Sequence, residues 1–130
     1  MAAITAESAP GVLPKNFLRP CLLLLLREQP AHGYELLERL RPLGFERSDP
    51  GRLYRALRAL EAEGLVRSAW ESSDNGPDRR IYELTKAGNL ALYDAAQSLV
   101  TTHTILDVFL SRYSEFVAIG QERRPAPEPR

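Results

Sequence analysis

An apolar repeat in the last third of the chain restricts the fold more than any other feature of this sequence. Its members are spaced alternately by four and three residues, which is typical of a helix that packs lengthwise against another helix. They are Leu92, Ala96, Leu99, His103, Leu106, Leu110, Tyr113 and Val117. The repeat predicts one unusually long helix from Lys86 to about Ile119, with Thr85 as its capping residue.

The rest of the chain has room for one compact core, because 130 residues cannot supply a second independent one. Residues 1–14 are rich in alanine, proline and small polar residues, and residues 122–130 read ERRPAPEPR. Proline disfavours regular structure, so we expect a flexible arm over residues 1–14 and a disordered tail over residues 121–130. The expected division is completed by a domain over residues 15–85 and the long helix over residues 86–120.

Two helices are predicted in the first part of that domain. Residues 16–28 are apolar around most of the helical circumference, which indicates a central position in the core. A second helix is expected from about residue 33 to residue 43, with apolar residues on one face and Gly44 as a stop. Cys21 lies on the first helix, and we interpret it as an inert core thiol.

A third helix begins at Ser48-Asp49-Pro50, a capping signal followed by proline in the first turn, and should extend to Glu63. Three leucines fall on one of its faces, and three arginines project from the opposite or flanking faces. The leucines are Leu53, Leu57 and Leu60, and the arginines are Arg52, Arg55 and Arg58. The spacing predicts a buried stripe beneath an arginine-rich outer surface.

A β-hairpin is predicted after Gly64. Two apolar strands, residues 65–70 and 81–84, flank a polar stretch that contains Asn75-Gly76-Pro77. Arg79 and Arg80 stand at the start of the returning strand. Three short helices, a hairpin and a long helix together predict a mainly α fold with a small β-hairpin wing, that is, a winged helix-turn-helix with a long C-terminal dimerisation helix.

This layout predicts binding to double-stranded DNA, because one helix fits the major groove while the others hold it there. The third helix is the natural insert, and the wing can reach the neighbouring backbone. The expected DNA-binding residues are Ser48, Gly51, Arg52, Tyr54, Arg55, Arg58, Arg79 and Arg80. For Tyr54 a half-buried packing role is an open alternative.

The long helix also predicts a homodimer. Its stripe is too long to bury against so small a domain, and an apolar stripe left in water marks an interface. The eight repeat residues, Leu92 to Val117, are the expected dimer interface, with His103 satisfied by the hydroxyl of Thr102 or Thr104. Two-fold pairing predicts a palindromic operator.

Three segments resemble the PadR family of transcriptional regulators. They are HGYELLERL at residues 32–40, DPGRLYRALRALEAEGLV at residues 49–66 and DRRIYELTKAG at residues 78–88. The resemblance implies a homodimeric regulator, usually a repressor, that a small molecule releases from DNA. NFLRPCLLLLL at residues 16–26 is most similar to members labelled poly-beta-hydroxybutyrate-responsive repressors.

The effector is unidentified from the sequence. Its possible pocket is expected beside Phe17, Trp70, His103 and Phe109, although for Trp70 packing of the wing against the body is the favoured alternative. The last helix has no tryptophan, which departs from the multidrug-binding members of the family. For His32 we expect a capping or packing role.

Other classes of function find little support. No catalytic motif, metal-ligand cluster or cofactor motif is present, so an enzyme is not expected. The single cysteine, the absence of a secretory signal and the shortness of the apolar run at residues 22–26 predict a cytoplasmic protein without membrane association. A net charge of zero leaves open a protein-interaction module without DNA binding, and the sequence does not separate a repressor from an activator.

Overall fold

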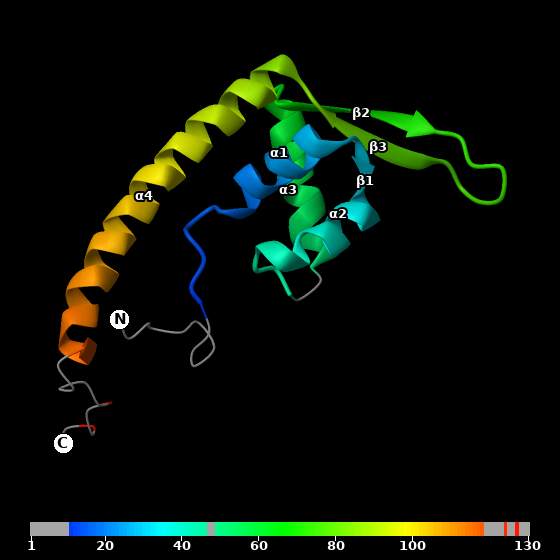
Figure 1. Ribbon diagram of the computed structural model, residues 1–130. Helices are drawn as coiled ribbons and strands as arrows, with labels where there is room; N and C mark the ends of the chain where they lie inside the picture. The colour runs from blue at the N-terminus through cyan, green and yellow to red at the C-terminus, as the bar shows by residue number, and fades with distance from the viewer. Residues whose placement is uncertain (1–10, 47–48, 119–123, 125–126, 128–130) are drawn as a thin grey trace. The chain divides into compact units, whose positions relative to one another are not determined.

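The computed structural model describes residues 11–46, 49–118, 124 and 127, and it divides into the part Val12–Gln97 and a part that contains the last helix from Ser98 onward. The mainly α fold with a hairpin wing is confirmed (Figure 1). In chain order the elements are α1 (Leu18–Glu28), β1 (Ala31–His32), α2 (Gly33–Arg39), the 3-10 helix η2 (Arg41–Leu43), α3 (Pro50–Ala62), β2 (Val66–Glu71), β3 (Arg79–Leu84) and α4 (Lys86–Ala118).

The core of the part Val12–Gln97 is built around α1, as its all-round apolar pattern predicts. Leucines of α1, α2 and α3 and a valine of β2 are the largest fully buried side chains, and they are Leu22, Leu36, Leu53, Leu57, Leu60 and Val66. Within the run at residues 22–26 only Leu24 is exposed. The Cys21 thiol is buried in this core, and burial raises its pKa to about 11, as expected for an inert thiol.

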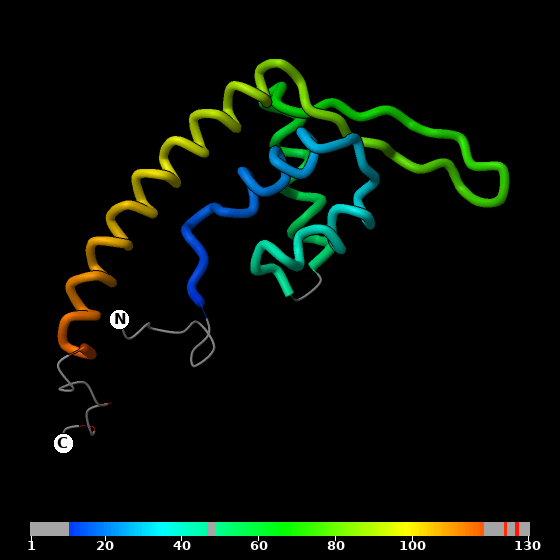
Figure 2. The backbone as a smooth tube through the Cα atoms, in the orientation of Figure 1, coloured from blue at the N-terminus to red at the C-terminus, as the bar shows by residue number. Residues whose placement is uncertain are grey.

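The sheet has one strand more than the predicted hairpin. Its order is β1-β3-β2 with antiparallel pairing, and Ala31 and His32 of β1 lie opposite Tyr82 and Ile81. Two residues are too short to show an alternating pattern, so β1 has no sequence signal of its own. Figures 1 and 2 show the connection of β2 to β3 extending beyond both strands.

The helix bounds differ from the expected ones at the start of α1 and at the end of α2. α1 begins at Leu18 and not at residue 16, because Asn16 has a left-handed φ of 60°. α2 ends at Arg39 and is followed by η2, where proline at position 42 interrupts the α-helical hydrogen bonds. Gly44 then stops the helical segment with a φ of 99°, as predicted.

Helix α4 begins as expected, because the Gly88 N–H donates to Thr85 Oγ1 at 3.0 Å. Thr85 also donates to the Gly64 carbonyl at 2.7 Å, which joins the start of α4 to the end of α3. α4 is described to Ala118. The predicted arm over residues 1–14 and the tail over residues 121–130 fall largely outside the described residues.

Candidate DNA-binding surface

Helix α3 starts with the predicted cap. Asp49 Oδ1 accepts a hydrogen bond from the Arg52 backbone N–H at 3.0 Å, and Pro50 occupies the first turn, where no N–H is needed. Ser48, which we expected both in this capping signal and in DNA contact, lies outside the described residues. The cap fixes the end of α3 on which Gly51 and Arg52 lie.

The two faces of α3 are as different as the sequence predicts. Its three core leucines are at most 1% exposed, whereas Arg52, Arg55 and Arg58 are all exposed. No described carboxylate oxygen lies within 4.0 Å of the guanidinium nitrogens of these three arginines. Their charges are therefore not compensated by ion pairs with other described residues.

Two of these arginines have defined neighbours. The Arg52 guanidinium lies 5.7 Å from the centre of the Phe45 ring, and Phe45 in turn stacks on Phe17 with ring centres 6.2 Å apart. Arg55 Nη1 lies 3.2 Å from the position that a Cβ atom would take at Gly51. Gly51 thus gives the Arg55 side chain room above the first turn of α3.

Tyr54 packs against Gly33 and is also exposed. Its side chain is 38% exposed, and its Oη atom lies 2.3 Å from where a Cβ atom would be at Gly33. The ring therefore packs closely against Gly33, and any side chain at position 33 would displace it. This contact joins α3 to the start of α2.

The wing arginine Arg80 is tied to α3. Its Nε donates to Ser68 Oγ at 2.7 Å, and Ser68 Oγ donates to Glu61 Oε2 at 2.8 Å. Arg80 Nη2 lies 3.8 Å from the same carboxylate oxygen, and its guanidinium lies 5.4 Å from the centre of the Trp70 ring. The charge of Arg80 is thus partly balanced by Glu61.

Arg79 has a different environment. Its Nη1 donates to Tyr34 Oη at 2.9 Å, and its guanidinium lies 5.9 Å from the centre of the Tyr34 ring. No described carboxylate lies within 4.0 Å of it. Tyr34 was missed as a site residue, because a tyrosine at the expected apolar spacing of α2 predicts core packing, yet it is 52% exposed.

His32 caps α2, in agreement with the sequence interpretation. Its backbone N–H donates to Glu35 Oε1 at 2.8 Å, and its ring Nδ1 lies 2.7 Å from the same oxygen. The hydrogen bond from the His32 backbone, followed by that from its ring, lowers the pKa of the Glu35 carboxyl below its ordinary value.

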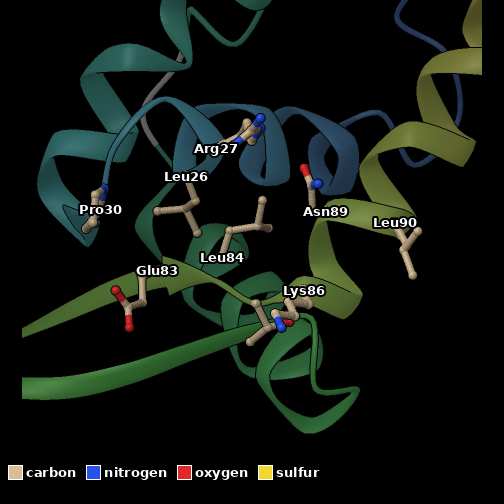
Figure 3. Close-up of a pocket in the computed structure, with 9 residues that line it drawn as sticks. Leu26, Arg27, Pro30, Glu83, Leu84, Lys86, Asn89 and Leu90 are labelled. Atoms are coloured by element: carbon tan, nitrogen blue, oxygen red, sulfur yellow. The ribbon is translucent and has the colours of Figure 1, made fainter.

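The residues expected around an effector have separate surroundings within the part Val12–Gln97. Phe17 stacks on Phe45, whereas Trp70 is 66% exposed with Arg80 over its ring, so the interpretation that Trp70 packs the wing against the body is wrong. Neither residue lines the hollow of about 530 Å³ that Figure 3 shows between the end of α1, β3 and the first turns of α4. Its lining includes Leu26, Arg27, Glu83, Leu84, Lys86 and Asn89.

On α4, the expected interface residues differ in exposure. Leu92 packs partly against the core of the winged part, whereas Leu106 is 53% and Leu110 43% exposed. Ala96 and His103 are also exposed, and Leu99, Tyr113 and Val117 are half-buried.

His103 and Phe109, the two residues of α4 that were expected near the effector, also have defined surroundings. His103 Nδ1 lies 3.4 Å from Asp107 Oδ2, and the hydroxyls of Thr102 and Thr104 donate to the carbonyls of Ser98 and Val100. The expectation that a threonine hydroxyl satisfies His103 is therefore wrong. Phe109 lines an apolar hollow of about 420 Å³ together with Ile105, Val108, Arg112, Tyr113 and Phe116.

The described part of the chain contains neither a metal-ligand cluster nor a membrane-spanning helix. No group of three or more histidine, cysteine, aspartate or glutamate side chains is placed to hold a metal ion. None of the described helices is both long enough and apolar enough to span a membrane.

Comparison with known proteins points to one family. The model of the transcriptional regulator PadR-like family matches residues 22–94. The transcriptional regulator Rv3488 of Mycobacterium tuberculosis is 41% identical over 68 residues, which are 52% of this chain and 62% of that protein. The match thus spans less than two thirds of that relative.

Solved structures agree with the family match. A PadR-like regulator from Bacillus cereus superposes with a TM-score of 0.66 at 29% identity, covering 74% of this chain and 93% of that one. A PadR family regulator from Eggerthella lenta gives a TM-score of 0.61 at 31% identity, covering 71% of this chain and 80% of that one. PadR regulators are DNA-binding transcription factors and not enzymes. The chain described here belongs to the transcriptional regulator PadR-like family.

Proposed function

We propose that this protein is a cytoplasmic, sequence-specific DNA-binding regulator of transcription, which acts as a homodimer on a palindromic operator. The observation that supports this most directly is the exposed face of α3. Arg52, Arg55 and Arg58 lie on it without an ion pair to any other described residue. A chain of zero net charge that leaves three arginines uncompensated on one helix has a local positive surface for an anionic partner.

The roles of the site residues follow from their surroundings. Arg52 and Arg55 read base edges or bridge phosphates from the first turns of α3, and Arg58 adds a phosphate contact. Arg79 contacts the backbone from the wing, and Arg80 chiefly holds the wing to α3. Gly51 and Tyr54 shape this surface, and Ser48 precedes it.

The dimer is proposed from the exposed apolar residues of α4. Leu106 and Leu110 of the repeat are exposed, together with Phe109 and Phe116 on the flank. Large apolar side chains on one soluble helix mark an interface, and a second copy of this chain offers a complementary stripe. A two-fold dimer presents the same reading surface twice, which matches a palindromic operator.

The effector is proposed as a small molecule that shifts the dimer between DNA-binding and free states, so that the regulator acts as a ligand-responsive repressor. Phe17, Trp70, His103 and Phe109 are proposed as separate candidate contacts for this molecule, each to be tested by its own substitution. The segment that resembles poly-beta-hydroxybutyrate-responsive repressors includes α1, which packs in the core. A binding screen with 3-hydroxybutyrate oligomers tests whether the effector belongs to that class, independently of the role of this segment in the fold.

The test is a fluorescence-anisotropy titration of the full chain with duplex DNA from the promoter of its own gene, over increasing salt. Wild type should bind tightly at low salt and lose affinity steeply as salt rises. Arg52→Ala/Arg55→Ala should weaken binding, and the salt slope should fall by about one for each of the two arginines that bridges a phosphate.

A matched control removes the same charge elsewhere. Arg41→Ala/Arg67→Ala deletes two arginines that are ion-paired with Glu38 and Glu83, and it should leave the slope unchanged. Equal effects of both double variants would show that only net charge matters. If wild type does not bind DNA at low salt, a protein-interaction module without DNA binding becomes the better description of this protein. If wild type does bind, the position of the operator relative to the promoter separates a repressor from an activator.

A further inference from the structure

The segment His32-Gly33-Tyr34, where β1 joins α2, contacts three elements of the proposed DNA-binding surface. Tyr34 Oη accepts a hydrogen bond from Arg79 of β3 at 2.9 Å, and Gly33 receives the Tyr54 ring of α3. His32 Nε2 lies 3.5 Å from Glu71 Oε1 of β2. The His32 and Tyr34 rings stack with centres 5.6 Å apart and planes 6° apart.

The contacts of Glu71 and Arg79 are unexpected for their register. The two residues lie directly opposite each other across β2 and β3. Opposite charges in that position normally attract and pair. Instead, the Glu71 carboxylate lies beside His32, and Arg79 donates to the neutral hydroxyl of Tyr34, with no described carboxylate within 4.0 Å of its guanidinium.

His32 is placed to retain the Glu71 carboxylate. Its side chain is only 11% exposed, and its ring is fixed between Glu35 on Nδ1 and Glu71 beside Nε2. Nε2 is buried and makes no hydrogen bond to another described atom. Each ring nitrogen faces one carboxylate, Nδ1 at 2.7 Å and Nε2 at 3.5 Å, and this placement keeps Glu71 turned away from Arg79.

We propose that the segment His32-Gly33-Tyr34 keeps two opposite charges at the end of the wing apart: His32 retains Glu71, and Tyr34 retains Arg79, so that the positive charge of Arg79 is free for a DNA phosphate. His32 and Tyr34 are thereby positioning residues for a wing contact, and they need not touch DNA themselves. This inference rests on the proposed DNA-binding function.

The central experiment measures DNA affinity for His32→Asn with and without Glu71→Gln. Asparagine is a preferred helix N-cap, so the start of α2 is kept, but its side chain is too short to retain Glu71. Glu71 should then pair with Arg79, and affinity should fall about fivefold. Adding Glu71→Gln should restore affinity to within about twofold of wild type, which loss of a merely structural contact would not allow.

Two single variants give the change in DNA affinity and salt slope to expect from the loss of one wing arginine. Arg79→Gln should weaken binding about tenfold and lower the salt slope by about one. Arg67→Gln is the matched control, because this wing arginine pairs with Glu83, and it should leave the slope unchanged. If Glu71→Gln raises affinity equally with His32 present or replaced, it removes only a repulsive charge, and the proposed separation of the two charges is overturned.

A second pair of variants covers a failure of His32→Asn to fold. Tyr34→Phe keeps the ring stack and removes the hydroxyl acceptor of Arg79. It should weaken binding about threefold in the wild-type chain and have no effect in the Arg79→Gln chain. An equal loss in both chains overturns the inference. If Arg79→Gln binds like wild type while Arg52→Ala/Arg55→Ala does not, only this inference fails; if wild type does not bind, the proposed function fails.

Discussion

Gly88 shows how a single residue sets the joint between the wing and α4. A Cβ atom at this position would lie 2.0 Å from the Leu65 carbonyl oxygen and 2.6 Å from Leu84 Cδ1. The Leu65 backbone is fixed by its own hydrogen bonds, including the one that its carbonyl accepts from the Thr85 N–H at 3.2 Å. The close approach of α4 to this backbone therefore requires glycine.

We predict that Gly88→Ala lowers the free energy of unfolding by about 3 kcal/mol, since the backbone must move to admit one methyl group. Urea denaturation of the purified variant measures this. Gly76→Ala is the control, because a Cβ atom there meets only Ser73 Oγ at an ordinary 3.7 Å, and it should change stability by less than about 0.5 kcal/mol. A Gly88→Ala protein as stable as wild type would contradict the assigned contact.

The sequence pattern shows where Gly88 lies in the last helix but not why glycine is required there. From the pattern alone it is a glycine in the first turn of a helix, where glycine costs least, whereas the structure shows a required close contact. Tyr34 is the opposite case, because a tyrosine at core spacing turned out to be exposed and hydrogen-bonded to Arg79. Both roles depend on residues far away in the sequence, which local patterns cannot reveal.

At the scale of elements, the carboxylate of Glu35 makes the start of α2 sensitive to acid. The hydrogen bond from the His32 backbone holds the pKa of this carboxyl below its ordinary value of 4.5. A group whose pKa is lower in the folded state stabilises the fold above its unfolded pKa. That contribution is lost as the pH falls through the lower, folded-state pKa.

We therefore predict that Glu35→Gln destabilises the protein at neutral pH and that the difference from wild type shrinks as the pH falls below about 4.5. Urea titrations over a series of pH values measure it. Glu38→Gln on the same helix is the control, because Glu38 makes only an exposed ion pair with Arg41 at 3.5 Å. A Glu35→Gln difference that stays constant into acid would exclude this role for the cap.

The presence of most helices and strands could be predicted from the sequence, whereas their first and last residues were predicted less well. The leucine stripe of α3, the cap at Asp49 and the hairpin follow from local residue patterns that can be read directly from the sequence. The strand β1 was missed because its two residues become a strand only by pairing with β3. The bend at Asn16 and the switch to η2 are likewise local conformations that periodicity does not report.

For the whole molecule, the apolar residues of α4 predict a dimer that a single charge can separate. Leu106 lies in the proposed seam and is 53% exposed, so Leu106→Lys should fold like wild type. A lysine there would place an uncompensated charge in the paired stripe, and sedimentation should find monomers at concentrations where wild type is dimeric. The monomer should also bind a palindromic operator far more weakly, because its two half-sites are no longer linked.

Thr104→Lys is the matched control. Thr104 lies on the same turn of α4 but away from the repeat, and its hydroxyl donates to the Val100 carbonyl. This variant gains the same charge and should remain dimeric, whereas a general effect of charge on α4 would separate both proteins. If Leu106→Lys sediments as a dimer, the repeat from Leu92 to Val117 is not the seam. The flank around Ile105, Phe109 and Phe116 would then be the face to test, with Phe109→Lys as the variant.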